Sequence, residues 1–470
     1  MAPKRSSKAS NSVPKSTRAT KQAQSVQKPL AAGREADRLQ IDGTAALGFD
    51  NAREKAPAAS GRTYSSKGAS WVDVDAPVPP FGSRKRKRRV VEARDEAPIE
   101  DAGDERDGDA DKQFLDEARR QLKRSKRDDC REIVRYLRRI EPATHLADAH
   151  IVSVEQARRL LQGDRILTAP VFVAHAANTA GILAPESDER PVEQLLAWFH
   201  DPTEHISRGK ELGQIRQRFV ANRRPSGTPW NFPDTPNPFH HSGIPLFLQD
   251  PSCNVLADVV RGVFDISAGV ICTDACTNER TSSPHCCNEH LTQAVELKTG
   301  WRQWSGAIMF AEAGAVTEAH WDYWGFSTWV TCLEGEMGLG FLPDATEADR
   351  IALLEQRLQP DNRWRYRFLR PEDTVYFSGG TPHLFFRLPE GRQTAGLGGH
   401  IVRRPDVESW IRLNRLRVEV EEREGANLEN ADVYRALVIG IDHWLEQVKP
   451  KGLKRIRAEL KRLRTVVDRL

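Results

Sequence analysis

One short motif limits what this chain can fold into more than any other feature. In the segment 317–322, Thr-Glu-Ala-His-Trp-Asp, a histidine and an aspartate stand two residues apart, after a strand-like run that ends at Gly314. Side chains two apart on a β-strand point to the same face, so His320 and Asp322 are expected to face one way. His383 follows sixty-one residues after Asp322, in a strand, glycine turn, strand pattern. Two imidazoles and one carboxylate form a donor set that holds Fe(II) and leaves coordination positions open.

The same residues have a plainer interpretation. A His-x-Asp motif arises by chance in a chain of this composition, and a lone histidine before an apolar run, as His383 is, often belongs to a core. This chain, however, contains a single such motif. A threonine precedes its histidine by three residues, strands flank it, and a second histidine follows a turn. The joint pattern favours the metal site.

With these motifs, the sequence resembles the JmjC family of Fe(II)/2-oxoglutarate oxygenases, in particular fungal JmjC-domain proteins. The resemblance runs from about Ser153 to Arg404, and its most specific parts are the segments 229–238 and 317–329 and the surroundings of His383. It implies a mostly β catalytic core with flanking α-helices. The core is expected to be a double-stranded β-helix, a jelly-roll of the cupin-like kind, whose inward face holds the metal.

The resemblance also implies a chemistry. Fe(II) would be held by His320, Asp322 and His383, and 2-oxoglutarate would bind the metal as cosubstrate with a hydrogen bond from Thr317. JmjC relatives hydroxylate protein side chains or demethylate methyl-lysine. The expected function is therefore a dioxygenase with a protein substrate, histones being the candidate, and the sequence leaves the two reactions open.

One position departs from the family pattern. JmjC oxygenases usually carry a lysine two residues after a glycine on the strand that follows the His-x-Asp motif, where it pairs with the far carboxylate of 2-oxoglutarate. Here Met337 stands two residues after Gly335, and methionine leaves a buried carboxylate unpaired at high cost. Arg387 is the predicted replacement, because it follows His383 by four residues and so faces the same side of the strand. The other interpretation of Arg387 is a solvated charge at the rim. Without a replacement, the chain would be a catalytically inactive JmjC-fold chromatin or scaffold protein.

Residues 1–112 are predicted to form a disordered arm, basic at first and acidic later. Residues 1–37 carry eight lysines and arginines against two acids, with almost no large apolar side chain. A run of six cations follows, typical of a nuclear localisation signal or a nucleic-acid patch. It consists of Arg84, Lys85, Arg86, Lys87, Arg88 and Arg89. The chain shows neither a secretory apolar region nor an apolar run of membrane-spanning length. We therefore expect a nuclear protein without membrane contact, with an import receptor or nucleic acid as partner of the cationic run.

The remaining chain is predicted to have three parts. Residues 113–150 form a helical lead-in, because apolar residues recur at helical spacing with basic residues between them. Residues 151–405 form the β domain, and residues 406–470 form C-terminal helices. The last helix carries a seam of apolar residues spaced three and four apart: Leu453, Ile456, Leu460, Leu463, Val467 and Leu470. This seam predicts either a dimerising or partner-binding helix, with a homodimer through the C-terminal helix, or docking of the helix onto the barrel.

Cysteines are concentrated in one segment. Five of the seven cysteines lie between Cys253 and Cys287, and histidines accompany them. The possible ligands of a structural zinc ion are Cys272, Cys276, His285, Cys286, Cys287 and His290. Their spacing matches no regular zinc pattern, so reduced cysteines in an insertion loop are the alternative. The odd count argues against a disulfide framework.

Overall fold

The computed structural model describes residues 108–143, 147–200, 205–207, 210–220, 227–238, 243–267, 306–423 and 431–470. The cationic run 84–89 and the possible zinc ligands between 272 and 290 lie outside these ranges. No helix in the described ranges combines the length and the apolar character that crossing a membrane requires.

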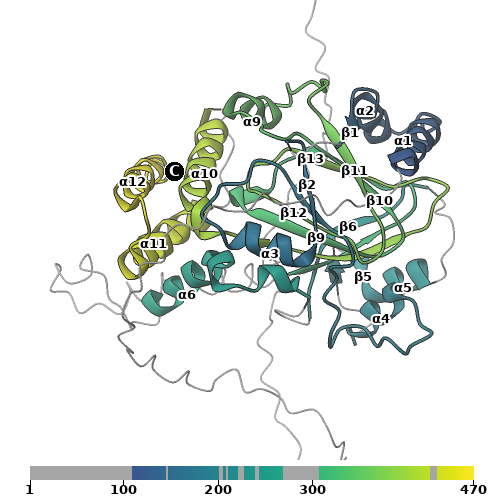
Figure 1. The fold of residues 1–470 in the computed structure, drawn as a ribbon, viewed down its shortest axis with the longest axis horizontal. Coiled ribbons are helices and arrows are strands. Elements are labelled where there is room, and N and C mark those ends of the chain that lie inside the picture. The colour runs from purple at the N-terminus through teal and green to yellow at the C-terminus, as the bar shows by residue number, and fades with distance from the viewer. Residues whose placement is uncertain are drawn as a thin grey trace, which may run out of the picture. The chain divides into compact units, whose positions relative to one another are not determined.

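Two larger β-sheets form the centre of the fold (Figure 1). The five-stranded sheet has the order β1 (Glu141–Pro142), β11 (Arg365–Leu369), β10 (Met337–Phe341), β13 (His383–Phe386) and β8 (Val316–His320). The seven-stranded sheet has the order β2 (His150–Val152), β3 (Val171–Val173), β12 (Thr374–Phe377), β9 (Ser327–Glu334), β14 (Thr394–Ile401), β7 (Ala307–Ala311) and β6 (Asn231–Pro236). A separate pair joins β4 (His205–Ser207) to β5 (Lys210–Glu211). The pairs β1–β11 and β2–β3 are parallel, and the other strand pairs are antiparallel.

The alternation along β13 shows how the core is divided. Phe385 belongs to the cluster between the two sheets, where it lies with residues such as Val330 of β9 and Val375 of β12. Leu384 and Phe386 point the other way, into a cluster with the first two helices. Every residue of the strand is buried, so both faces are covered. His383 shares the inward face with Phe385 because the two residues are two apart on the strand.

Helices cover the outer faces of both sheets (Figure 1). Helices α1 (Gly108–Leu122) and α2 (Asp128–Leu137) pack their apolar sides on the five-stranded sheet. Helices α3 (Val154–Gln162), α4 (Pro191–Ala197) and α5 (Leu212–Val220) pack on the seven-stranded sheet. The start of α3 is fixed by a capping box, in which the Ser153 hydroxyl accepts from the Gln156 amide and the Gln156 side chain accepts from the Ser153 amide.

The C-terminal helices form a further cluster. Helices α6 (Val255–Ser267), α10 (Val407–Arg423), α11 (Ala431–Val448) and α12 (Leu453–Val467) share one apolar core, which Trp324 and Phe326 of the β8–β9 connection enter. The seam residues Leu460 and Leu463 of α12 are 3% and 1% exposed inside this core. The apolar seam is therefore buried within the chain, but α12 packs on helices α10 and α11 and not on the barrel as the docking alternative expected.

Short elements complete the connections. The 3₁₀ turns are η1 (Leu246–Leu248), η2 (Pro251–Cys253), η3 (Tyr323–Gly325) and η4 (Arg404–Asp406), and α9 (Glu347–Leu354) lies between β10 and β11. Helix α1 begins at Gly108, earlier than the boundary expected at residue 113. Asp109 and Asp111 lie in its first turn, where carboxylates interact favourably with the helix dipole, so the acidic stretch supplies the start of the helix. The lead-in 113–150 also contributes β1 and the first residue of β2. These strands pair with the edges that β11 and β3 would otherwise leave open.

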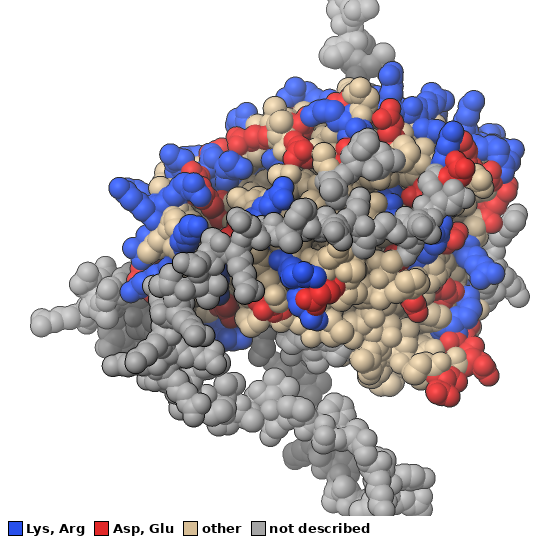
Figure 2. Space-filling model, viewed as in Figure 1, with Lys and Arg blue, Asp and Glu red and all other residues tan. Residues whose placement is uncertain are grey.

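The expected mostly β core with flanking helices is confirmed. Charged side chains of both signs are interspersed over the described part of the face that Figure 2 shows. On α1, for example, Arg120 pairs with Glu117. The described basic helix faces are thus partly neutralised by their own carboxylates.

Candidate metal centre

Strand pairing brings the two histidines of the predicted site together. His320 is the last residue of β8 and His383 the first of β13, and the two are direct partners in the antiparallel register. Their ring centroids lie 4.3 Å apart. Residues far apart in sequence are thereby neighbours across one strand pair. The His383 side chain is 2% exposed and the His320 side chain 40%, so the pair has one buried and one open side.

Asp322 completes the cluster from just beyond β8. It follows the end of the strand, but its backbone remains extended, with φ −61° and ψ 144°, so it still faces the same side as His320. Its Oδ1 lies 3.8 Å from Nε2 of His320 and 3.9 Å from Nε2 of His383. The ligand atoms of the three residues lie within 4.8 Å of one another. In the described residues this is the single group of that kind.

The hydrogen bonds of both imidazoles leave the same nitrogen free. Nδ1 of His320 lies 2.8 Å from the carbonyl oxygen of Glu318, and Nδ1 of His383 lies 2.9 Å from that of Thr381. A carbonyl only accepts, so Nδ1 carries the proton in each ring and Nε2 keeps its lone pair. Both lone pairs belong to the nitrogens nearest Asp322. Such backbone anchoring of the second nitrogen is the usual outer-shell support of a metal-binding histidine.

Electrostatics prepares the donors in the required protonation states. Burial, with the neighbouring His320 ring, lowers the pKa of His383 to about 4, so its imidazole is neutral near pH 7. For Asp322, burial favours the neutral acid, but the imidazoles of His383, His400 and His320 outweigh it and lower the pKa of the carboxyl. A neutral imidazole and an ionised carboxylate are the forms that bind a cation.

A residue pair that the sequence analysis did not single out supports Asp322. The Thr328 hydroxyl donates to Oδ2 of Asp322, and the Thr328 hydroxyl oxygen lies 2.9 Å from Nδ1 of His400. Since the hydroxyl proton goes to the carboxylate, the His400 nitrogen donates to the hydroxyl. Thr328 and His400 face each other across β9 and β14. This series of hydrogen bonds fixes the orientation of Asp322 and leaves its Oδ1 directed toward the histidines.

Arg387, the predicted partner of an anion, is buried on the same side as His383. It is 3% exposed, and burial lowers the pKa of its guanidinium to about 10. Its Nε donates to the Thr394 hydroxyl at 3.1 Å, and its Nη2 lies 4.0 Å from Sδ of Met337. Nη1 is buried without a hydrogen-bond partner among the described residues. The alternative of a solvated rim charge is wrong, because the side chain is enclosed.

Thr317 lies beside this group. It pairs with Phe385 across β8 and β13, so it shares the side that carries His383. Its hydroxyl oxygen accepts a hydrogen bond of 3.0 Å from Nδ2 of Asn231 on β6. That interaction leaves the Thr317 hydroxyl proton available. The sequence motif 229–238 contained Asn231, and the structure assigns it this contact.

The aromatic residues of the motif divide between core and surface. Trp321 is 2% exposed, and Trp324 packs its ring on Tyr434 of α11 at 4.8 Å between centroids. Tyr323 is 36% exposed. Packing is therefore the role of the two tryptophans, and Tyr323 alone of these aromatic residues reaches the surface.

Helix α10 holds the segment that follows Asp322. Trp324 has φ 60° and ψ 12°, a left-handed conformation that is strained for a bulky side chain. Its carbonyl oxygen accepts from Nε1 of Trp410 at 2.7 Å and from Nδ2 of Asn414 at 2.8 Å. The guanidinium of Arg417 lies 3.6 Å from the centroid of the Tyr323 ring. Contacts from one helix thus maintain the strained turn next to a candidate metal ligand.

Together these features define the class of the protein: a β-sheet core flanked by helices, with a two-histidine, one-carboxylate cluster suited to a divalent metal ion. No family model matches the chain, and no curated protein matches it. It is similar to a solved structure of oxalate decarboxylase from Bacillus subtilis, studied for its Mn(II) centres, at 19% identity over 20% of each chain and a TM-score of 0.15. A variant of that enzyme matches at 18% identity over 20% of each chain, also with a TM-score of 0.15. The match thus spans about a fifth of either chain and carries no weight for fold or function.

Proposed function

We propose that this chain is an Fe(II)- and 2-oxoglutarate-dependent oxygenase of JmjC type. The proposal includes the finer fold, a double-stranded β-helix or jelly-roll of strands β7 to β14. Its support is the order in which the chain visits the sheets: β7, β9, β12 and β14 lie in one sheet and β8, β10, β11 and β13 in the other. A chain that crosses repeatedly between two facing sheets winds as a β-helix.

The donor set fits Fe(II). Two imidazoles and a carboxylate, with every ligand atom inside a 4.8 Å group, match the facial triad of non-haem iron oxygenases. His320, Asp322 and His383 would hold the metal, and the partly exposed side of His320 leaves an approach for other ligands. When bound, the iron with 2-oxoglutarate supplies oxygen activation. The chain itself orients the donors through Glu318, Thr381 and Thr328.

The observation that carries the proposal is the buried charge of Arg387. A guanidinium that is 3% exposed, with one nitrogen lacking a hydrogen-bond partner in the described chain, is unfavourable unless an anion joins it. It lies beside Met337, where related oxygenases carry a lysine, and on the side of the sheet that holds His383. A dicarboxylate could place one end at the metal and the other at Arg387, with the Thr317 hydroxyl as a further donor. The donors present therefore fit 2-oxoglutarate.

The proposed substrate is a protein side chain, with histones as the candidate, in a hydroxylation or a demethylation. The cationic run 84–89 favours a nuclear location, with an import receptor or nucleic acid as its partner. Near the metal cluster, the partly exposed ring of Tyr323 offers a surface for a substrate. These points rest on the resemblance and on the sequence.

A second candidate function is a non-catalytic chromatin or scaffold protein. Met337 favours it, because the residue is 1% exposed and packs with Leu339, Phe341 and Phe385 between the sheets. If that packing leaves no room for a cosubstrate, the chain keeps the fold and the metal ligands without turnover.

One experiment separates these functions. The full chain is purified without oxygen and loaded with Fe(II), and the release of succinate from 2-oxoglutarate is measured with and without histone peptides. Calorimetry with the Mn(II) form measures 2-oxoglutarate binding directly. Binding with succinate release supports the oxygenase. Metal binding without any 2-oxoglutarate binding refutes the oxygenase and leaves the scaffold.

A further inference from the structure

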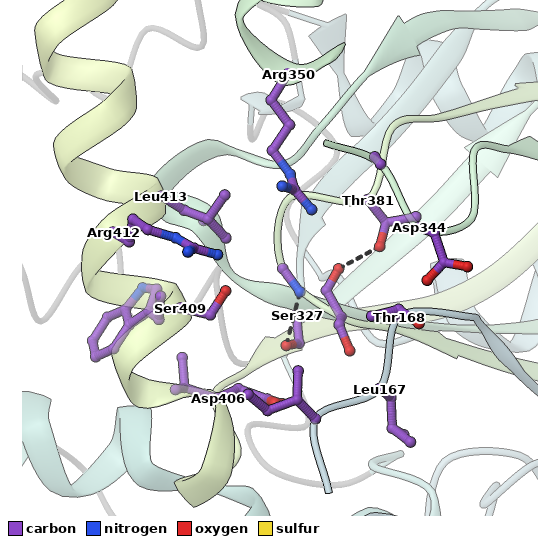
Figure 3. A pocket seen from close by; sticks show the side chains of 17 residues that line it. Leu167, Thr168, Ser327, Asp344, Arg350, Thr381, Asp406, Ser409, Arg412 and Leu413 are labelled. Carbon is purple, nitrogen blue, oxygen red and sulfur yellow. Dashed lines mark hydrogen bonds between the residues drawn. The ribbon is translucent and has the colours of Figure 1, made fainter. Parts of the chain in front are cut away.

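A polar cavity lies next to the loops that carry the metal ligands. It has a volume of about 170 Å³ and is bounded by α9, by α10, and by the connections β8–β9 and β12–β13 (Figure 3). Ser327 and Thr381, which line it, belong to the chain on either side of the metal ligands: Ser327 follows Asp322, and Thr381 precedes His383. None of the three metal ligands lines the cavity.

Two arginines from different helices point into this cavity. Figure 3 shows the side chain of Arg350 entering from α9 and that of Arg412 from α10. Nε of Arg350 donates to the carbonyl oxygen of Gly380 at 2.7 Å, which fixes the guanidinium at the wall. Among the described residues neither arginine forms an ion pair with a carboxylate. Burial and the charge of Arg412 lower the pKa of Arg350, and the carboxylates of Asp349 and Glu347 offset this effect only in part.

The carboxylates of the lining do not cancel this charge. Asp406 already has a cation, because its Oδ2 lies 3.7 Å from Nε of Arg403 and 3.4 Å from the Tyr376 hydroxyl. Asp344 is exposed and lies on a different wall of the cavity from Arg412 (Figure 3). Once the Asp406–Arg403 pair is set aside, two cations and one carboxylate remain, so the lining carries one net positive charge.

We propose that this cavity binds a small oxyanion, a phosphate group or a carboxylate, between Arg350 and Arg412. Guanidinium groups match such oxygens with paired N–H donors. The hydroxyl groups of Thr168 and Ser409 line the same space and add neutral donors. A volume of about 170 Å³ is far above the ~10–15 Å³ that a single water needs, and it suits a phosphate or a short carboxylic acid.

The anion would also bridge the two loops that carry the metal ligands. The Ser327 hydroxyl accepts from the Gly379 amide at 3.1 Å, so the β8–β9 and β12–β13 connections are already joined at the cavity wall. An occupant held by α9 and α10 would restrain this junction. Because coupling between two binding sites is reciprocal, the anion should then tighten the binding of a divalent metal by the factor with which the metal tightens the anion. This second step rests on the proposed metal site; the anion site itself does not.

The test uses the full chain freed of metal with EDTA, in a buffer without phosphate. Inorganic phosphate is titrated and followed by calorimetry and by the midpoint of thermal unfolding. We expect saturable binding that Arg412→Ala weakens about tenfold or more, the loss of one charge-assisted contact. Arg412 is exposed on α10, so the variant should fold. Arg423→Ala is the matched control, since it removes another exposed arginine of the same helix outside the cavity, and should bind phosphate as the wild type does.

Two further arms fix the site and the source of the oxyanion. Succinate replaces phosphate in a parallel titration, and the tighter of the two identifies the occupant as a phosphate group or a carboxylate. Arg387→Met should leave the phosphate titration unchanged, because Arg387 serves the proposed dicarboxylate cosubstrate and does not line this cavity. Absence of saturable binding to the wild type by either anion overturns the proposal, and so does a loss of phosphate binding in Arg387→Met or Arg423→Ala equal to that in Arg412→Ala. Failure of iron binding leaves this result intact, since no metal is present in the titration.

Discussion

Nη2 of Arg387 lies 4.0 Å from Sδ of Met337, inside the space between the two sheets. The Arg387 guanidinium, just after the end of β13, therefore lies beside the position on β10 where the JmjC oxygenases that the sequence resembles carry a lysine. Cross-strand pairing explains the proximity. Gly338 pairs with Phe386 in an antiparallel register, so Met337, before Gly338, lies opposite Arg387, after Phe386. Under the proposed function, Arg387 would supply that positive charge from the end of the neighbouring strand.

This relationship predicts the effect of exchanging the two side chains. Arg387→Met should weaken 2-oxoglutarate binding to the Mn(II) form roughly 30-fold or more, since a buried charge loses its partner. Met337→Lys alone would place a second cation at roughly 4 Å from the guanidinium and should destabilise the fold. The double variant Met337→Lys with Arg387→Met should recover most of the binding, because one cation then faces the cosubstrate. Calorimetry measures all three. Wild-type affinity in Arg387→Met would exclude Arg387 as the anchor.

Metal binding should depend on the ligands and, more weakly, on their support. His320→Ala and Asp322→Ala should each abolish Mn(II) binding, because a donor is lost from a set of three. His400→Gln should weaken it by about 10–100-fold, the usual effect of losing an outer-shell partner, since Thr328 then holds Asp322 less firmly. Equilibrium dialysis with Mn(II) measures both effects. The exposed His175 provides the control, and His175→Gln should bind as the wild type does. An unchanged affinity in His400→Gln would assign that residue to packing.

Much of the cluster follows from the period of a strand. The two-residue period of a strand places His320 on the same face as Asp322, and His383 on the same face as Arg387. This prediction needs no knowledge of the partner strands. The pairing of His320 with His383 depends instead on the register of β8 against β13, which the motifs imply only through the family resemblance. Local periodicity therefore predicted the faces, and tertiary pairing determined the distances.

The residues that the sequence did not reveal are those whose role comes from register or backbone strain. His400 follows two glycines and has no motif of its own; its contact with Thr328 exists because β14 pairs with β9. The left-handed conformation of Trp324 likewise has no sequence signal, since glycine is the residue expected there. Such positions become visible only when the partner elements, here β9 and α10, are in place.

The cationic run can be tested apart from the structure. Alanine at every position of 84–89 should move a fluorescent fusion of the full chain from the nucleus to the cytoplasm, because an import receptor reads clustered cations. Six cations of the segment 1–37 replaced by alanine provide the control with equal loss of charge, and this variant should remain nuclear. Confocal imaging of both gives the result. Nuclear accumulation of the 84–89 variant would assign the run to another partner, such as nucleic acid.

The stability of α9 should depend on pH through Asp349. Hydrogen bonds from Arg363, at 2.8 and 3.0 Å, and from Thr346 hold the pKa of Asp349 below its ordinary value of 3.8. A carboxyl with a lowered pKa stabilises the folded state above its ordinary pKa and loses this contribution as the pH falls below 3.8. Asp349→Asn should therefore lower the free energy of unfolding by about 1–2 kcal/mol at pH 7, a value reduced by the exposure of Arg363. Denaturant unfolding should show this difference constant down to pH 4 and smaller below it. A difference that grows on acidification would contradict the assignment.

Helix α10 should act on metal affinity through the turn at Trp324. Asn414→Ala removes one of the two donors to the Trp324 carbonyl, so the strained turn beside Asp322 is held less well. We expect the Mn(II) dissociation constant to rise roughly three- to tenfold, because one hydrogen bond contributes about 0.5–1.5 kcal/mol while Trp410 still donates to the same carbonyl. Val418→Ala is the matched control: Val418 is fully buried on the same helix, and its truncation should lower the midpoint of thermal unfolding without changing Mn(II) affinity.

The Mn(II) electron paramagnetic resonance spectrum adds a readout that general destabilisation does not alter. A displaced Asp322 changes the symmetry of the donors around the ion. Asn414→Ala should therefore change the zero-field splitting of the bound Mn(II), while Val418→Ala should leave the spectrum as in the wild type. Trp410 donates to the same carbonyl oxygen at 2.7 Å, so Trp410→Phe, which keeps the apolar ring and removes the N–H donor, should reproduce the change. Equal losses of affinity in Asn414→Ala and Val418→Ala would show that α10 supports the fold in general and not this ligand.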